Sequence, residues 1–104
     1  MLEALSRRLR GFAGIVTDLA FRPVVERVAR YLTALSARRR YREIDLPLTQ
    51  AQLAARLGTV RELVARALAE LQRNGVIART QSTIVIRDPT RLAALARGEA
   101  AEAV

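Results

Sequence analysis

The chain has 104 residues, enough for one domain with one modest hydrophobic core. It contains no cysteine and no histidine, which excludes disulfide frameworks, thiolate nucleophiles, thiolate or imidazole metal ligands and the usual general base. All 18 basic residues are arginine, and the net charge of +8 favours an anionic partner, most often nucleic acid. Biased codon usage would explain arginine in place of lysine, but not the excess of basic over acidic residues.

Neither a membrane span nor a signal peptide is expected. Arginines break every apolar run well short of the roughly 20 residues that a bilayer crossing needs. The N-terminal sequence MLEALSRRLRG has an early acidic residue, and its arginines interrupt the apolar ones. We therefore expect a cytoplasmic protein with no membrane partner.

The first predicted element is a helix with apolar residues at alternating spacings of three and four. These residues are Leu2, Leu5, Leu9, Phe12, Val16 and Leu19. Such a heptad seam predicts that two copies pair side by side through residues 2–19. The alternative is an amphipathic helix that packs on its own domain, since fewer than three full heptads are present. Pro23 is expected to end this segment or to begin a new helix.

The stretch PVVERVARYLTAL, residues 23–35, is predicted to be a second helix. Its core-facing residues at helical spacing are Val24, Val28, Tyr31, Leu32 and Leu35. The basic run ARRRYRE, residues 37–43, could follow a phosphate backbone, but such runs are more often solvated loops. The sequence IDLPL, residues 44–48, alternates and contains a proline, so it predicts a short edge strand.

The next segment predicts a helix-turn-helix. Thr49 and Gln52 fit a capping box at the start of a short helix, which Gly58 is expected to end in a left-handed conformation. The residues of this helix that face inward are predicted to be Leu53, Ala54 and Leu57. Only a short turn then precedes a second amphipathic helix over residues 60–73.

This second helix has an inward stripe and a flat outward face. The inward stripe is predicted to comprise Val60, Val64, Ala67, Leu68 and Leu71. The outward face carries Glu62, Ala65, Arg66, Ala69 and Arg73, with Arg61 at its flank. Such a face fits the major groove, where arginine can bind guanine and glutamate can accept from cytosine. The structural alternative is an i,i+4 pair of Glu62 with Arg66 and a second capping box of Thr59 with Glu62.

Residues 76–87 predict a β-hairpin with a polar turn at Gln81 and Ser82, and Gly75 is expected to cap the preceding helix. Asp88 and Pro89 fit the N-cap and first residue of a short last helix. The order of elements predicts a mainly α fold with a small antiparallel β wing. This is a winged helix-turn-helix preceded by an N-terminal helix.

The run LTQAQLAARLGTVRELVARALAELQRNGVI, residues 48–77, resembles the DNA-binding domain of the Crp–Fnr family of bacterial transcription regulators. DLAFRPVVERVARYL, residues 18–32, is similar to the junction between that family's dimerisation helix and this domain. The most specific part of the likeness is Gly-x-x-Arg-Glu-x-x-x-Arg within a capped helix-turn-helix. The resemblance implies the end of a dimerisation helix at 1–20 and a winged helix at 21–98. The small and acidic composition of residues 99–104 predicts a flexible tail.

By this resemblance Arg61, Glu62 and Arg66 occupy the base-reading positions, and members with this trio commonly read a GTGA-like half-site. Phosphate contacts are expected from Thr49, Gln50, Thr59, Arg73, Arg79, Ser82 and Thr83. The implied partners are double-stranded DNA, a second copy in a homodimer and RNA polymerase. Inverted half-sites would then lie about 34–36 Å apart.

Several positions depart from the family's pattern. Val60 and Leu63 stand where the family usually has hydroxyl residues that touch phosphate, and the wing turn lacks the usual glycine and basic residue. The family's sensory domain would precede the dimerisation helix, whereas this sequence begins within that helix, so a fragment and a short protein both remain open. No cofactor is expected in this segment.

A competing hypothesis is a truncated winged-helix interaction module. It would dimerise with full-length regulators without reading DNA specifically. An enzyme is not expected, since the acidic residues are scattered and the sequence offers no nucleophile, general base or glycine-rich phosphate loop. We therefore expect no catalytic residue and no metal ligand.

Overall fold

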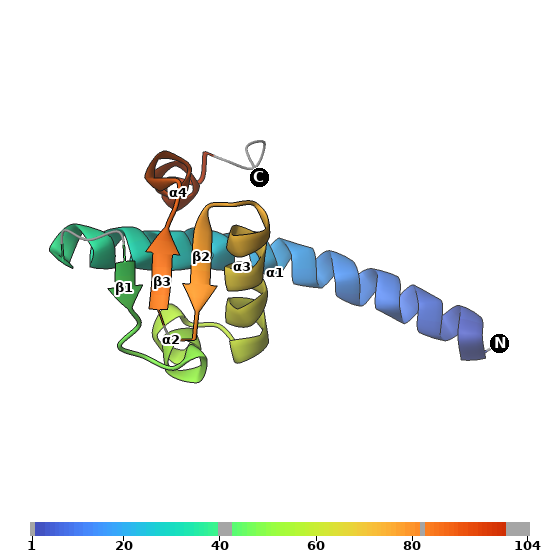
Figure 1. Cartoon of the computed structure of the whole chain (residues 1–104). Coiled ribbons are helices and arrows are strands. Elements are labelled where there is room, and N and C mark those ends of the chain that lie inside the picture. Colours follow the sequence, from blue (N-terminus) through green and yellow to red (C-terminus); the bar gives the residue numbers. More distant parts are fainter. Residues whose placement is uncertain (1, 40–42, 82, 100–104) are drawn as a thin grey trace.

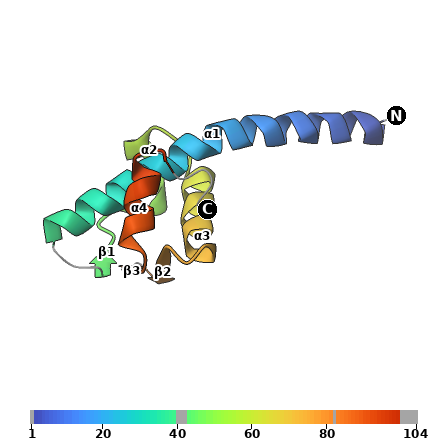
Figure 2. The same ribbon diagram turned by 90° about the horizontal axis from the view of Figure 1, so that it is seen from above.

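The computed structural model describes residues 2–39, 43–81 and 83–99, with side chains from residue 19 onward except residue 39. The elements are α1 (Leu2–Arg39), β1 (Glu43–Asp45), α2 (Gln50–Leu57), α3 (Arg61–Arg73), β2 (Ile77–Thr80), β3 (Thr83–Ile86) and α4 (Pro89–Ala96). The short helices and the sheet gather around the C-terminal half of α1, while its N-terminal half projects away (Figures 1 and 2). The predicted architecture, mainly helical with a small antiparallel wing, is confirmed.

α1 is a single helix of 38 residues that runs through Pro23. The sequence predicts a helix end or start at this proline, and that prediction is wrong. Proline lacks the N–H that would bond the carbonyl four residues earlier, which belongs to Leu19. Because Leu19 is 73% exposed, water can serve this carbonyl, and burial of Phe21 and Val24 holds the helix on either side of the proline. In the described part of the chain, no helix has the long apolar stretch that a membrane crossing requires.

The basic run at residues 37–43 is helical at its start rather than a loop. α1 continues to Arg39 and β1 begins at Glu43, while residues 40–42 lie outside the described residues. β1 is an edge strand, as predicted, but it is shorter than the predicted range 44–48. It ends before Pro47, which has no N–H to donate to a strand ladder.

The sheet has three antiparallel strands in the order β1-β3-β2. Ile44 of β1 lies opposite Ile84 of β3, and Ile77 of β2 lies opposite Ile86, so one face of the sheet is apolar and buried. The hairpin of β2 and β3 confirms the predicted wing. Its turn residue Gln81 has a φ of 55°, in the left-handed region that tight hairpin turns use.

One hydrophobic core joins α1, the other helices and the inner face of the sheet. α1 packs against α2, α3, α4 and β1. Its predicted core residues Val24, Val28, Leu32 and Leu35 are buried, and Tyr31 is half-buried. The C-terminal half of α1 therefore forms the surface against which α2 and α3 of the helix-turn-helix pack.

Candidate nucleic-acid interface

The first helix of the helix-turn-helix begins with the predicted capping box. The Gln52 N–H donates a 3.1 Å hydrogen bond to the Thr49 hydroxyl, and the Thr49 N–H donates a 2.9 Å bond to the Gln52 side chain. Gly58 follows α2 with a φ of 71°, the predicted left-handed end. The N–H of Thr59 then donates to the carbonyl of Ala54 at 2.9 Å, which fixes the turn toward α3.

α3 begins at Arg61, one residue later than predicted, with Val60 as its N-cap. Val60 has an extended backbone and makes no side-chain capping bond, so the predicted capping box of Thr59 with Glu62 is wrong. Its predicted place in the inward stripe is also wrong, because its side chain is 54% exposed. A residue with non-helical backbone angles does not follow the angular spacing of the helix after it.

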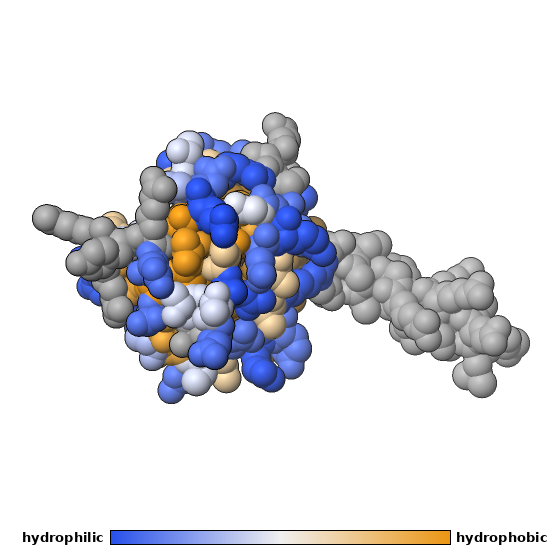
Figure 3. Space-filling model, in the orientation of Figure 1, coloured by the Kyte–Doolittle hydropathy of each residue, from blue (hydrophilic) through white to orange (hydrophobic). Residues whose placement is uncertain are grey.

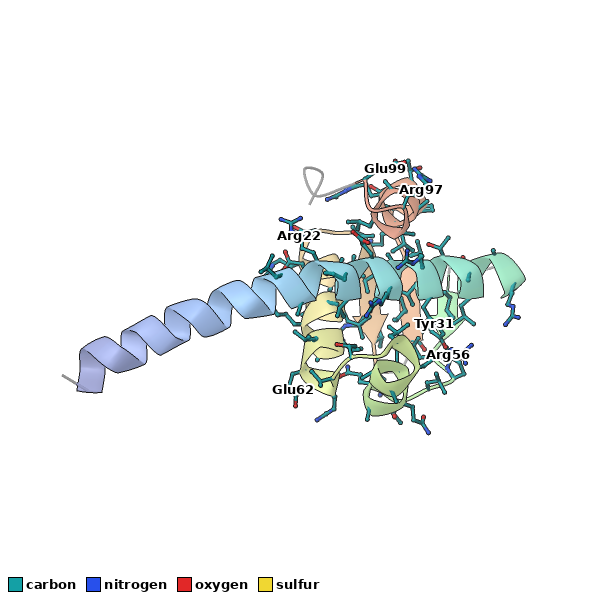
Figure 4. All side chains as sticks on the ribbon, turned by 180° about the vertical axis from the view of Figure 1, so that it is seen from behind. Arg22, Tyr31, Arg56, Glu62, Arg97 and Glu99 are labelled. Atoms are coloured by element: carbon teal, nitrogen blue, oxygen red, sulfur yellow. The ribbon has the colours of Figure 1, made fainter. Side chains whose placement is uncertain are left out.

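The remainder of α3 has the predicted two faces. The buried residues are Val64, Ala67, Leu68 and Leu71. The outward face carries exposed side chains at Arg61, Glu62, Arg66, Ala69 and Arg73, with Ala65 half-buried. Glu62 points away from the domain at the N-terminal end of α3 (Figure 4), and hydrophilic residues predominate, with paler ones between them, on the visible side where α3 lies (Figure 3).

Arg66 contacts α1 as well as solvent. Its guanidinium carbon lies 4.1 Å from the centre of the Phe21 ring, a cation–π distance. Phe21 is only 9% exposed and belongs to the hydrophobic core. No local pattern in the sequence joins these two residues, because only the packing of α1 on α3 brings them together.

Three of the four phosphate candidates at the helix-turn-helix lie near the helix starts, and the fourth lies at the end of α3. Thr49 is exposed and precedes α2, Gln50 is its first residue, and Thr59 lies in the turn before α3. Arg73 is exposed at the far end of α3 and forms an ion pair with Glu70. These four candidates are therefore spread over both ends of the motif.

The candidates in the wing have partners within the fold. Arg79 Nε donates a 3.0 Å hydrogen bond to the Gln72 side chain, and the Thr83 hydroxyl donates a 2.7 Å bond to Asp45. Ser82 lies outside the described residues. β2 ends and β3 begins at the same end of the domain as α2, so the wing turn lies on the side of the helix-turn-helix (Figure 1).

Two arginines that the sequence analysis did not identify donate hydrogen bonds to the C-terminal ends of α2 and α3. Arg27 of α1 donates a 3.3 Å hydrogen bond to the carbonyl of Leu57, at the end of α2. Arg91 of α4 donates a 2.9 Å bond to the carbonyl of Asn74, the C-cap of α3. Carbonyls at helix ends lack intrahelical donors, so these bonds satisfy and position both helices. The partners are distant in sequence, and no spacing signal reveals them.

Aromatic contact adds a further support. The guanidinium of Arg56 on α2 lies 5.9 Å from the centre of the Tyr31 ring on α1, and Figure 4 shows the two side by side.

Gly75, with a φ of 74°, follows the C-cap of α3, as expected of a helix-ending glycine.

The predicted dimer seam is described only at its last position. The side chains of Leu2, Leu5, Leu9, Phe12 and Val16 lie outside the described residues, although their backbone is helical. Leu19 is strongly exposed for a large apolar residue. Its exposure leaves an apolar position on α1 open to a partner.

Comparisons with known proteins match this architecture. Residues 26–95 fit the family model of the Crp-like helix-turn-helix domain. The CRP-like cAMP-activated global transcriptional regulator of Mycobacterium tuberculosis is 36% identical over 102 residues, covering 93% of this chain and 46% of that protein. The transcriptional activator protein Anr of Pseudomonas protegens is 31% identical over 103 residues, covering 94% of this chain and 42% of that protein.

Solved structures agree with these relatives. The Catabolite Activator Protein of Thermus thermophilus has a TM-score of 0.73 and 31% identity, covering 94% of this chain and 45% of that one. DNR from Pseudomonas aeruginosa has a TM-score of 0.70 and 27% identity, covering 90% and 42%. The chain thus spans somewhat less than half the length of the relatives it matches. Because the family model covers most of its residues, this chain belongs to the Crp-like helix-turn-helix family.

Proposed function

We propose that this chain binds double-stranded DNA sequence-specifically as part of a transcription regulator, with α3 in the major groove. The observation that carries the proposal is the exposure of Arg61 and Glu62 at the N-terminal end of α3 in a Crp-like helix-turn-helix. The N-terminal turns of a recognition helix are the part that reaches base edges. The names of the relatives, which describe transcription regulators, support the same reading.

The base-reading residues we propose are Arg61, Glu62 and Arg66. Arginine can donate two hydrogen bonds to guanine, and glutamate can accept one from the amino group of cytosine. A GTGA-like half-site offers two guanines on one strand and two cytosines on the other, which suits two arginines and one glutamate. The capped start of α2 and the turn at Gly58 support this placement by fixing the entry of α3.

Phosphate contacts would position the domain along the backbone. Thr49, Gln50 and Thr59 lie at or just before helix starts, where backbone N–H groups favour an anion. Arg73 and Arg79 each have an internal partner, but a guanidinium carries five N–H donors, so a phosphate can share it. Ser82 and Thr83 complete the set at the wing.

A homodimer is part of the proposal. Pairing through residues 2–19 would place two copies of α3 at inverted half-sites, about 34–36 Å apart. The exposure of Leu19 supports an apolar contact at the end of that seam. Since one relative is named an activator, contact with RNA polymerase in the bacterial cytoplasm belongs to the proposal as well.

The test is a base-by-base scan of one half-site. We compare the wild type with Arg61→Ala on duplexes that carry each single substitution in an inverted GTGA site. At the base pair that Arg61 contacts, the wild type should prefer one base over the other three by about 1–3 kcal/mol in binding free energy. Arg61→Ala should bind all four bases at that position with equal affinity.

Arg87→Ala is the matched control. It removes the same charge from an exposed side chain outside α3, and it should keep the discrimination of the wild type. Identical base profiles for wild type and Arg61→Ala would refute base reading by Arg61. A wild type that binds no duplex, yet still pairs with a full-length relative, would favour an interaction module instead.

A further inference from the structure

We propose that Phe21 of α1 competes with DNA for the guanidinium of Arg66. The position of α1 relative to α3 then changes the affinity with which Arg66 binds a base. This inference rests on the proposed function, because it assigns a control to one of the proposed base-reading residues. It starts from the 4.1 Å distance between the guanidinium carbon of Arg66 and the ring centre of Phe21.

The position of Arg66 on its helix makes this contact informative. Arg66 lies opposite the buried stripe that contains Val64, Ala67 and Leu68. A side chain at this position can extend away from the domain, toward a groove. Its guanidinium instead lies over Phe21, a core residue of another helix. The side chain is therefore folded back along α3, and it must leave the ring to reach a base on the far side.

Both partners attract the same positive group. The face of the Phe21 ring carries the negative part of its quadrupole, and the major-groove edge of guanine presents two acceptors. In the proposed docking, the base lies beyond the outward face of α3 whereas the ring belongs to α1, so the two contacts compete for one guanidinium. The contact with Phe21 thus lowers the net gain from reading a base.

The place of Phe21 on α1 connects this competition to the rest of the molecule. Phe21 lies two residues from the exposed Leu19 and two from Pro23, and it is the first buried residue of α1 among those whose side chains the structure describes. A shift of α1 relative to α3 changes the distance from the ring to Arg66. A partner that binds α1 and holds it in another position therefore changes the affinity for DNA by some factor. By linkage, DNA changes the affinity for that partner by the same factor.

The first test uses variants of the full chain. Phe21→Leu keeps an apolar side chain but removes the ring face, whereas Phe21→Tyr keeps the ring. We measure the ratio of affinities for an inverted GTGA duplex and a scrambled duplex. Phe21→Leu should raise this ratio about two- to fivefold, and Phe21→Tyr should leave it unchanged. In an Arg66→Ala background, Phe21→Leu should have no effect on the ratio.

An unchanged or reduced ratio in folded Phe21→Leu would overturn the proposal, because the ring would then be only a packing residue or would present Arg66 to DNA. Thermal unfolding of each variant verifies that it is folded under the binding conditions. Phe21→Met offers a second ring-free side chain where Phe21→Leu melts too early, and it carries the same expectation.

The second test needs no substitution. In the free chain, the ring should shift the NMR signals of the Arg66 side chain upfield. Saturation with the inverted GTGA duplex should return them to ordinary positions. Retention of the shift in a complex that still prefers the inverted site would overturn the competition alone. A chain that shows the upfield shift but binds no duplex would overturn the proposed function, and the competition with it.

Discussion

The guanidinium of Arg91 on α4 donates a 2.9 Å hydrogen bond to the backbone carbonyl of Asn74, directly after the end of α3. Arg27 of α1 makes the equivalent contact at the end of α2, through the carbonyl of Leu57. Cations are favourable at helix C-termini, where carbonyls lack partners. Part of the net charge of +8 therefore stabilises the helix-turn-helix itself, and is not all available to an anionic partner.

Arg91→Ala should lower the free energy of unfolding by about 1.5 kcal/mol, since a charged donor is lost from a helix-end carbonyl. Denaturant unfolding measures this change. Arg87→Ala is the matched control, because it removes the same charge from an exposed side chain and should change stability by less than about 0.5 kcal/mol. Equal losses for the two variants would show that the bond to Asn74 contributes nothing specific.

Thr49→Ala should destabilise the domain by about 1 kcal/mol, because the hydroxyl accepts the N–H of Gln52 at the start of α2. Thr49→Ser keeps an acceptor and should retain most of the stability. Thr90→Ala, at an exposed position in the first turn of α4, controls for the loss of a threonine. A loss of stability in Thr49→Ser as large as that in Thr49→Ala would contradict the capping role of the hydroxyl.

Gly58→Ala should cost about 1 kcal/mol, and the cause is backbone conformation rather than crowding. The φ of Gly58 is 71°, and apart from the glycine itself and its two chain neighbours no heavy atom lies within 4 Å of the place a Cβ would take. Gly58→Asn should cost less, since asparagine tolerates the left-handed region better than alanine does. The order wild type, Asn, Ala in thermal stability supports this reason, and the reverse order of the two variants contradicts it.

The pair of Arg97 and Glu99 beyond α4 gives a prediction for pH (Figure 4). Hydrogen bonds of 3.0 and 3.2 Å from Arg97, and then its charge, hold the pKa of the Glu99 carboxyl below its ordinary value. Stabilisation from such a lowered pKa is present above the unfolded-state pKa and is lost as pH falls through the folded-state pKa. Both groups are exposed, so the effect on stability is small.

An NMR titration of the Glu99 carboxyl measures this pKa directly. Arg97→Gln should raise the midpoint toward the ordinary value of 4.5, because it removes both the charge and the bidentate bonds. A midpoint that does not move in this variant would show that Arg97 does not act on Glu99 in solution.

Local sequence signals predicted the elements whose cause is itself local. The capping box at Thr49, the left-handed Gly58 and the N-cap Asp88 each act within a few residues, and the structure confirms all three. The failures at Pro23 and Val60 have other causes. Packing of α1 on the core overrides the local effect of Pro23. Val60 is the N-cap of α3 and lies outside the helix, so the helical spacing of α3 does not predict where its side chain points.

The candidate site was predicted only in part for the same physical reason. The exposure of Arg61, Glu62 and Arg66 follows from the helical period of α3, so the sequence contains it. The contacts of Arg66 with Phe21 and of Arg91 with Asn74 depend on how separate helices pack. No spacing along the chain encodes such packing, and the sequence therefore gave no sign of them.

The most direct test of the central claim is fluorescence anisotropy of the wild-type chain at one stated salt concentration. It compares an inverted GTGA duplex with a scrambled duplex of the same composition. The account predicts tighter binding to the inverted site, with an affinity for both duplexes that falls as salt rises. Equal affinity for the two duplexes would contradict base reading by α3 and would leave only electrostatic attraction between the arginines and the DNA backbone.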